Sequence, residues 1–184
     1  MAYETGTVYK IAIGTSSAAL PTSWPNQGGS ITYPTDWTLL GGQSSTDILL
    51  DDDSVKIAFR TESVDIDPPL AQAKLSEIPI KECAETLTFA TYQTNLAVLS
   101  LDSLASVSTN EVTLDTSPDY KQVIVEETGV GAFYFPKTIV RVESISGGVK
   151  ALFKVEFKVS VFGTTDIPAG FKYIGFAAAK GDSE

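Results

Sequence analysis

The segment Glu82–Leu104 restricts the possible folds most, because a strand pattern with one polar face runs directly into a helix pattern. Around Leu87 and Phe89 the apolar residues alternate with threonines, as a half-buried strand requires. From Asn95 onward the leucines fall close to helical spacing, and an upstream threonine hydroxyl can cap the first free amides. We therefore predict one amphipathic helix at about residues 94–105, next to a strand. The residues expected to pack this helix on the sheet are Leu96, Leu99 and Leu104.

Most of the remaining sequence alternates as in β-strands. The clearest case is Leu152–Phe162, where apolar residues alternate with charged or hydroxyl residues, so that one face of the strand is wet. The pair Gly147–Gly148 precedes it and predicts a hairpin turn from an upstream strand at Thr138–Ser144. Further strands are expected at Thr7–Ile13, Lys121–Glu126 and Phe171–Phe176. The chain is therefore predicted to be mainly β, a β-sandwich or partial barrel with one flanking helix.

The chain length of 184 residues suits one well-buried core. Hydrophobic residues make up 43% of the sequence and charged residues 20%, which is ordinary for a folded protein and argues against disorder. No internal repeat and no linker divides the sequence. We predict a single domain over residues 1–184.

An acidic run, Asp51–Asp53, separates two further strand patterns. The patterns at Asp47–Leu50 and Ser54–Phe59 predict a hairpin whose turn is this run. A calcium loop of the EF-hand type would need a glycine at its sixth position and a distal glutamate in register, and the sequence has neither. A solvated acidic turn is therefore the preferred interpretation.

The segment from Gly14 to Thr46 has no periodicity and contains several prolines and glycine pairs. Such a long irregular loop is uncommon in a compact domain and is usually a functional or contact loop. It carries three large aromatic side chains that must pack on something, either on their own domain or on a neighbouring subunit. These candidates for inter-subunit contact are Trp24, Tyr33 and Trp37.

The formal net charge is −10, from 23 acidic and 13 basic residues. Proteins that hold nucleic acid neutralise its phosphates with excess positive charge, and anionic membranes repel an acidic protein at long range. No apolar run is long enough to cross a bilayer, and the amino terminus lacks the basic and apolar segments of an export signal. We expect a soluble protein that neither grips nucleic acid nor binds a membrane.

The chain has one cysteine, Cys83, and no histidine. With a single cysteine the chain cannot form an intrachain disulfide or a zinc site built on several thiolates. Without histidine it cannot form a histidine-containing catalytic triad. We also find no phosphate-binding loop. The sequence therefore predicts no catalytic residue, no metal ligand and no cofactor.

Paired carboxylates leave one enzymatic alternative, because glycoside hydrolysis needs only two acids at a set separation. The pairs Asp65 with Asp67 and Glu126 with Glu127 would be the candidates. Acids that are close in sequence are common on solvated faces, so this alternative is the weaker one.

Three pieces of the chain resemble the major tail tube proteins of long, non-contractile-tailed bacteriophages. They are the strand-to-helix passage Glu82–Leu104, the segment Trp37–Gly41 and the late strand Val155–Val161. The resemblance implies a β-sandwich with a flanking helix, subunits joined in hexameric rings, and rings stacked into a hollow tube through which DNA leaves the virion. It implies no catalytic residues.

The resemblance also implies the partners and the location. The chain would contact other copies of itself, the tape measure protein, the tail terminator and the tail tip proteins, and DNA would pass without specific binding. Assembly would take place in the host cytoplasm and the product would be the tail of the virion.

A lumen that does not hold DNA favours acidic side chains, and the net charge of −10 agrees with this if enough of them face inward. The acids that alternation places on wet faces are Glu62, Asp65, Asp67 and Glu82. The strand Leu152–Phe162 departs from the pattern, because its wet face carries Lys154 and Lys158 beside only Glu156.

The main alternative to a tube subunit is a carbohydrate-binding β-sandwich. In that case Trp24, Tyr33 and Trp37 would form a platform on which sugar rings stack. Replacing the tryptophans would then abolish glycan binding and leave particle size unchanged.

Overall fold

The structure is a computed structural model, and it describes residues 9–21, 31–41, 48–62, 81–92, 95–127, 129–148 and 151–175. The structure is 62% β-strand, which confirms the prediction of a mainly β protein. One short helix accompanies a large antiparallel sheet that is not closed into a barrel.

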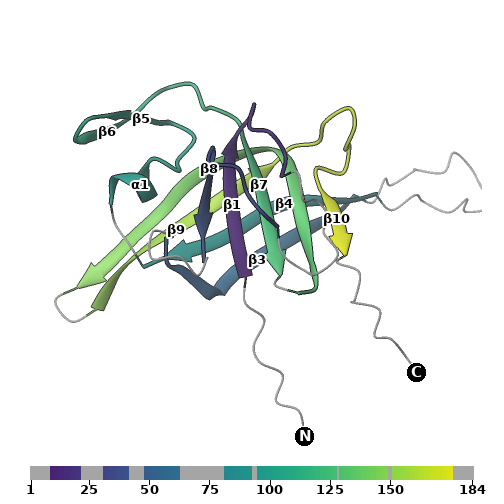
Figure 1. Cartoon of the computed structure of the whole chain (residues 1–184), viewed down its shortest axis with the longest axis horizontal. Helices are drawn as coiled ribbons and strands as arrows, with labels where there is room; N and C mark the ends of the chain where they lie inside the picture. The colour runs from purple at the N-terminus through teal and green to yellow at the C-terminus, as the bar shows by residue number, and fades with distance from the viewer. Residues whose placement is uncertain are drawn as a thin grey trace, which may run out of the picture.

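The elements follow the chain in a simple order (Figure 1). They are β1 (Tyr9–Thr15), β2 (Trp37–Leu40), β3 (Leu50–Glu62), β4 (Lys81–Thr91), α1 (Leu96–Leu99), β5 (Ala105–Ser108), β6 (Glu111–Leu114), β7 (Lys121–Glu127), β8 (Gly131–Gly148), β9 (Ala151–Val161) and β10 (Lys172–Gly175). The large sheet has the order β2-β1-β7-β8-β9-β4-β3, and β10 pairs with β8. Strands β5 and β6 form a separate two-stranded sheet.

Strand β8 changes its partner along its length. Its first half pairs with β7 on one side and β10 on the other. At Thr138 it pairs with both Lys121 of β7 and Val161 of β9, and from there on it pairs with β9. Because β7 pairs no further along β8, the backbone of Val140 and Val142 at that edge needs another partner. The turn after α1 supplies it.

The main core lies on one face of the sheet. Alternate residues of β4 and β9 point into it, and the rings of Phe89 and Phe157 stack there with centroids 5.0 Å apart. A second, smaller cluster covers the opposite face of β1 and β7. It contains Ala12, Ala18, Ile31, Trp37, Ile124 and Ala132. Strand β7 is therefore buried on both faces from Gln122 to Glu126, so its sequence shows no clean alternation.

The helix is shorter than the predicted range of 94–105, because it covers only Leu96–Leu99. Its cap is Asn95, whose Oδ1 accepts a hydrogen bond from the Val98 amide at 2.9 Å. After Ser100 the chain leaves the helix, since Asp102 and Ser103 bond to the edge of β8 instead of continuing the helical pattern. Tertiary hydrogen bonds therefore outweigh the leucine spacing.

Two loop predictions are also corrected. The expected hairpin around Asp51–Asp53 is a single strand, β3, with an irregularity between Asp51 and Lys56. Ser54 bridges this irregularity, because its Oγ accepts from the Ala90 amide at 2.7 Å. The predicted irregular segment 14–46 contains the end of β1 and all of β2, and β2 pairs with β1 in antiparallel register.

Candidate functional site

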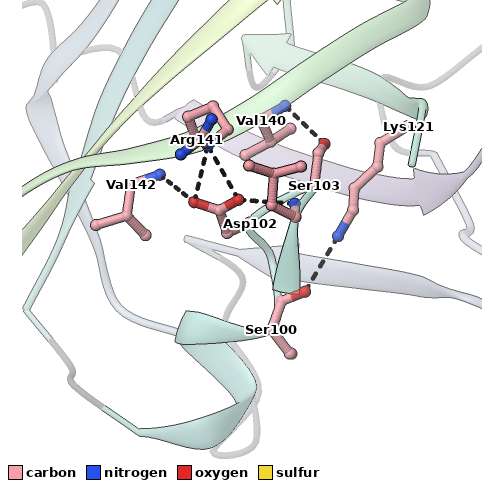
Figure 2. A network of polar contacts seen from close by, with 8 residues as sticks. Ser100, Asp102, Ser103, Lys121, Val140, Arg141 and Val142 are labelled. Carbon is pink, nitrogen blue, oxygen red and sulfur yellow. Dashed lines mark hydrogen bonds and ion pairs between the residues drawn. The ribbon is translucent and has the colours of Figure 1, made fainter. Parts of the chain in front are cut away.

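The carboxylate of Asp102 hydrogen-bonds to the backbone of β8 at the edge that β7 leaves unpaired (Figure 2). It is buried, and its Oδ2 accepts from the Val142 amide at 2.8 Å. Its Oδ1 accepts from the Leu104 amide at 2.8 Å and lies 3.2 Å from Nε of Arg141. One side chain therefore satisfies two backbone N–H groups and a guanidinium, and this fixes the start of the β5–β6 segment on the large sheet.

Two neighbours of Asp102 add to this anchor, and Figure 2 shows both. Ser103 donates its amide to the Val140 carbonyl at 2.7 Å, and its Oγ accepts from the Val140 amide at 2.9 Å. Lys121 donates from Nζ to the Ser100 carbonyl at 3.1 Å. Burial lowers the pKa of Lys121, while Asp102 and Asp119 act in the opposite direction. The anchor is thus a continuous set of contacts between α1, β7 and β8.

The β5–β6 hairpin stands apart from the large sheet (Figure 1). One of its faces is apolar and partly exposed. The register places every apolar residue of the two strands on the same side, because residues paired directly across point to one face. Val107 is 52% exposed and Leu114 is 65% exposed. A two-stranded hairpin is only marginally stable alone in water. We call this surface the hairpin face, formed by Ala105, Val107, Val112 and Leu114.

The described part of the β8–β9 hairpin that extends beyond β4 exposes a second apolar surface. The pairing of β4 with β9 ends at Val155, and the β8–β9 hairpin continues beyond it. On the core side of this extension Ile145 is exposed and Phe153 is 57% exposed. A Cβ added to Gly147 would meet the Phe153 ring, so this glycine lets the ring lie on the backbone of β8.

The opposite, wet face of β8, β9, β4 and β3 carries a line of cations. The registers place Arg141, Lys158, Thr88 and Lys56 side by side across these four strands. We call the three exposed cations, Arg141, Lys158 and Lys56, the basic row. Like charges on neighbouring strands destabilise a sheet. Asp102 offsets the charge of Arg141, but none of the salt bridges found among the described residues includes Lys56 or Lys158.

A polar pocket of about 310 Å³ lies beside the basic row, at the irregularity of β3. Its lining residues are Ser54, Thr88, Phe89, Ala90, Glu143, Lys154, Glu156 and Phe157. Lys154 lies 3.1 Å from the carboxylate of Asp51 and 3.6 Å from that of Glu156. The hydrogen bond to Asp51 raises the pKa of Lys154. Its charge is thus neutralised within the chain.

No metal centre emerges from the described ranges, where no group of three or more histidine, cysteine, aspartate or glutamate side chains could hold an ion. The same ranges contain no helix long and apolar enough to cross a membrane.

The predicted contact residues Tyr33 and Trp37 pack on their own domain. Trp37 is 5% exposed, and its Nε1 donates to the Ala19 carbonyl at 2.9 Å. The Tyr33 ring lies beside it with centroids 6.1 Å apart. This is the intrachain alternative of the two that the sequence left open. Trp24 lies outside the described residues.

Beneath Tyr33 lies a buried carboxyl group that sequence patterns do not single out for this role. Glu126 on β7 is fully buried, and its Oε2 accepts from the Tyr33 hydroxyl at 3.1 Å. Within the described ranges its other oxygen, Oε1, has no hydrogen-bond partner. Burial raises the pKa of Glu126, although Lys10 and the Tyr33 hydroxyl lower it. Glu127 follows it along the strand and points to the opposite face, so the two acids do not converge on one site.

Replacing Glu126 with Gln is expected to stabilise the protein relative to wild type as the pH rises. A carboxyl whose pKa is raised on folding contributes stability below its unfolded pKa, and that contribution is lost as the pH rises through the folded value. Gln mimics the neutral acid and does not titrate. Urea unfolding of both proteins between pH 4 and pH 8 measures this, and a constant difference between them would contradict it.

The remaining predicted residues are placed as follows. Asp65 and Asp67 lie outside the described residues, and the side chains of Glu62 and Glu82 are not described, although their backbones belong to β3 and β4. Leu96 is exposed and Leu99 and Leu104 are half-buried. The residues that pack this segment on the core are Val98 and Leu101. The cap at Asn95 fixes the first turn, because its side chain accepts from the Val98 amide.

Comparison with known proteins supplies no relative from which a role could be transferred. No protein-family model matches the chain, and no curated protein matches it either.

Proposed function

We propose that this protein is a structural virion subunit that assembles into stacked hexameric rings, which form the tube of a phage tail. The observation that carries the proposal is the hairpin face, an apolar sheet surface on which Val107 and Leu114 stay exposed beside the described part of the chain. An exposed surface of this kind on a soluble protein marks a contact site. The described part of the β8–β9 hairpin that extends beyond β4 gives the subunit a second such surface.

Two properties of the sheet also support assembly. The sheet is open, so β3 at its end is a long edge strand that another chain can cover. The described part of the subunit exposes two different apolar surfaces, and a contact between unlike surfaces repeats from copy to copy, closing a ring when the rotation between copies divides a full turn. The net charge of −10 would let DNA pass through such a ring without being held.

Substitution of the hairpin face tests this function. The double variant Val107→Ser with Leu114→Ser is expected to need at least about tenfold more protein to assemble, because two apolar side chains no longer leave water on contact. Sedimentation velocity across a concentration series measures the threshold. The matched control is Thr113→Ser, on the polar face of the same hairpin, which should assemble as wild type does. Unchanged assembly of the double variant would contradict the proposal.

A further inference from the structure

We infer that the β5–β6 hairpin of one copy docks on the basic row of the next copy. This inference rests on the proposed self-assembly and names the two surfaces that meet. Three observations carry it, namely the charge around the hairpin, the charge on the wet sheet face and the small side chains beside the basic row.

The charged residues of the hairpin segment itself are all acidic. Between Leu101 and Tyr120 the sequence has four acids and neither lysine nor arginine. Asp102 is buried in the anchor, whereas Glu111, Asp115 and Asp119 are exposed. Glu111 lies on the polar face of the hairpin with Thr113, and Asp115 and Asp119 follow the end of β6. The hairpin thus combines one apolar face with a net negative charge.

The basic row offers the complementary charge. Lys56 and Lys158 are exposed, and both lie on the same face as Arg141. Lys158 lies directly across from Arg141 on the neighbouring strand, and like charges in such a pair cost stability in the isolated chain. Acids from a second copy would remove that cost and orient the two copies.

The surface beside the basic row suits a flat apolar partner. The next line of residues across the same four strands is Ile139, Ser160, Thr86 and Ala58. All four are half-buried, and three of them are small. Small side chains let a second sheet approach to the usual spacing of about 10 Å. The hairpin face can then pack on this line, and the negative charge of the hairpin lies next to the cations.

The hairpin of a chain does not cover that chain's own basic row. Among the elements of the structure, β6 makes its main contacts with β5 and α1, and neither strand of the hairpin packs extensively on β3, β4 or β9. The contact therefore joins two copies from head to tail, and its repetition closes a ring when the rotation between copies divides a full turn.

Charge exchange tests this contact. The first variant, Glu111→Lys with Asp115→Lys, makes the hairpin basic. The second, Lys56→Glu with Lys158→Glu, makes the row acidic. Each variant alone is expected to need about tenfold more protein to assemble, because like charges then meet across the contact. In an equal mixture each basic hairpin meets an acidic row and each acidic hairpin meets a basic row, so rings with an even number of subunits should form again.

Controls separate this contact from general charge effects. Asp36→Lys with Asp166→Lys alters two exposed acids outside both surfaces and should leave assembly unchanged. Circular dichroism confirms that each variant is folded. If the wild type assembles but the exchanged variants assemble equally well, or fail to recover on mixing, the contact is wrong and the proposed function survives. If the wild type stays monomeric under all conditions, both fail.

Discussion

Replacing Phe157 with Ala is expected to lower the free energy of unfolding by about 4 kcal/mol. The Phe157 side chain is fully buried in the main core and stacks on Phe89, with ring centroids 5.0 Å apart. Removing it leaves a cavity among β4, β8 and β9, where neighbouring strands hold the backbone too firmly to collapse. Urea unfolding at a protein concentration below the assembly threshold measures the loss.

Phe153 provides a matched control on the same strand and the same side of β9. It is 57% exposed and lies beyond the end of β4. Phe153→Ala should therefore change the stability of the single chain by less than about 1 kcal/mol. Equal losses from the two substitutions would mean that the core is not where the structure places it.

Replacing Asp102 with Ala is expected to cost about 3 kcal/mol, because two backbone N–H groups and a guanidinium lose their acceptor. The Val142 and Leu104 amides should also exchange with solvent faster than in the wild type. Hydrogen exchange measured residue by residue tests this localisation. Asp166→Ala, at an exposed acid, should leave both stability and exchange unchanged. A small loss for Asp102→Ala without faster exchange at these amides would contradict the anchor.

Sequence periodicity predicts those strands best that have one wet and one dry face. Strand β9 is the clear example, since its apolar residues Val155, Phe157 and Val159 all enter the core. Strand β7 has both faces buried, and β3 is interrupted by its irregularity after Asp51. In both strands the conformation depends on pairing with neighbouring strands, and the periodicity of a single segment carries no information about that pairing.

The length of the helix could not be read from leucine spacing. The spacing around Leu96 and Leu99 is helical, but Asp102 forms its hydrogen bonds with β8, a strand 40 residues further along the chain. Contacts between distant segments of this kind override local preference. The same limit applies to Glu126, because its burial depends on Tyr33, which is 93 residues away.

The candidate surfaces differ in how visible they are in the sequence. The hairpin face has a local signal in the sequence. The apolar residues Ala105 and Val107 are separated by a serine, Val112 and Leu114 are separated by a threonine, and the two pairs flank the turn Thr109–Asn110. The basic row has none. Lys56, Arg141 and Lys158 meet only because the registers of four strands bring them into line.

The carbohydrate-binding alternative has less structural support than assembly. A stacking platform needs exposed aromatic faces. Trp37 is buried against its own domain, and Tyr33 is half-buried beside it with its hydroxyl bonded to Glu126. Burial also raises the pKa of Tyr33, so it remains a hydrogen-bond donor.

Negative-stain electron microscopy of the purified protein tests self-assembly most directly. Over a rising concentration series, with and without a tail initiator complex, we expect closed rings of six copies and then stacks of rings with a central channel. A population that remains monomeric at the highest concentration in the presence of the initiator would contradict the account.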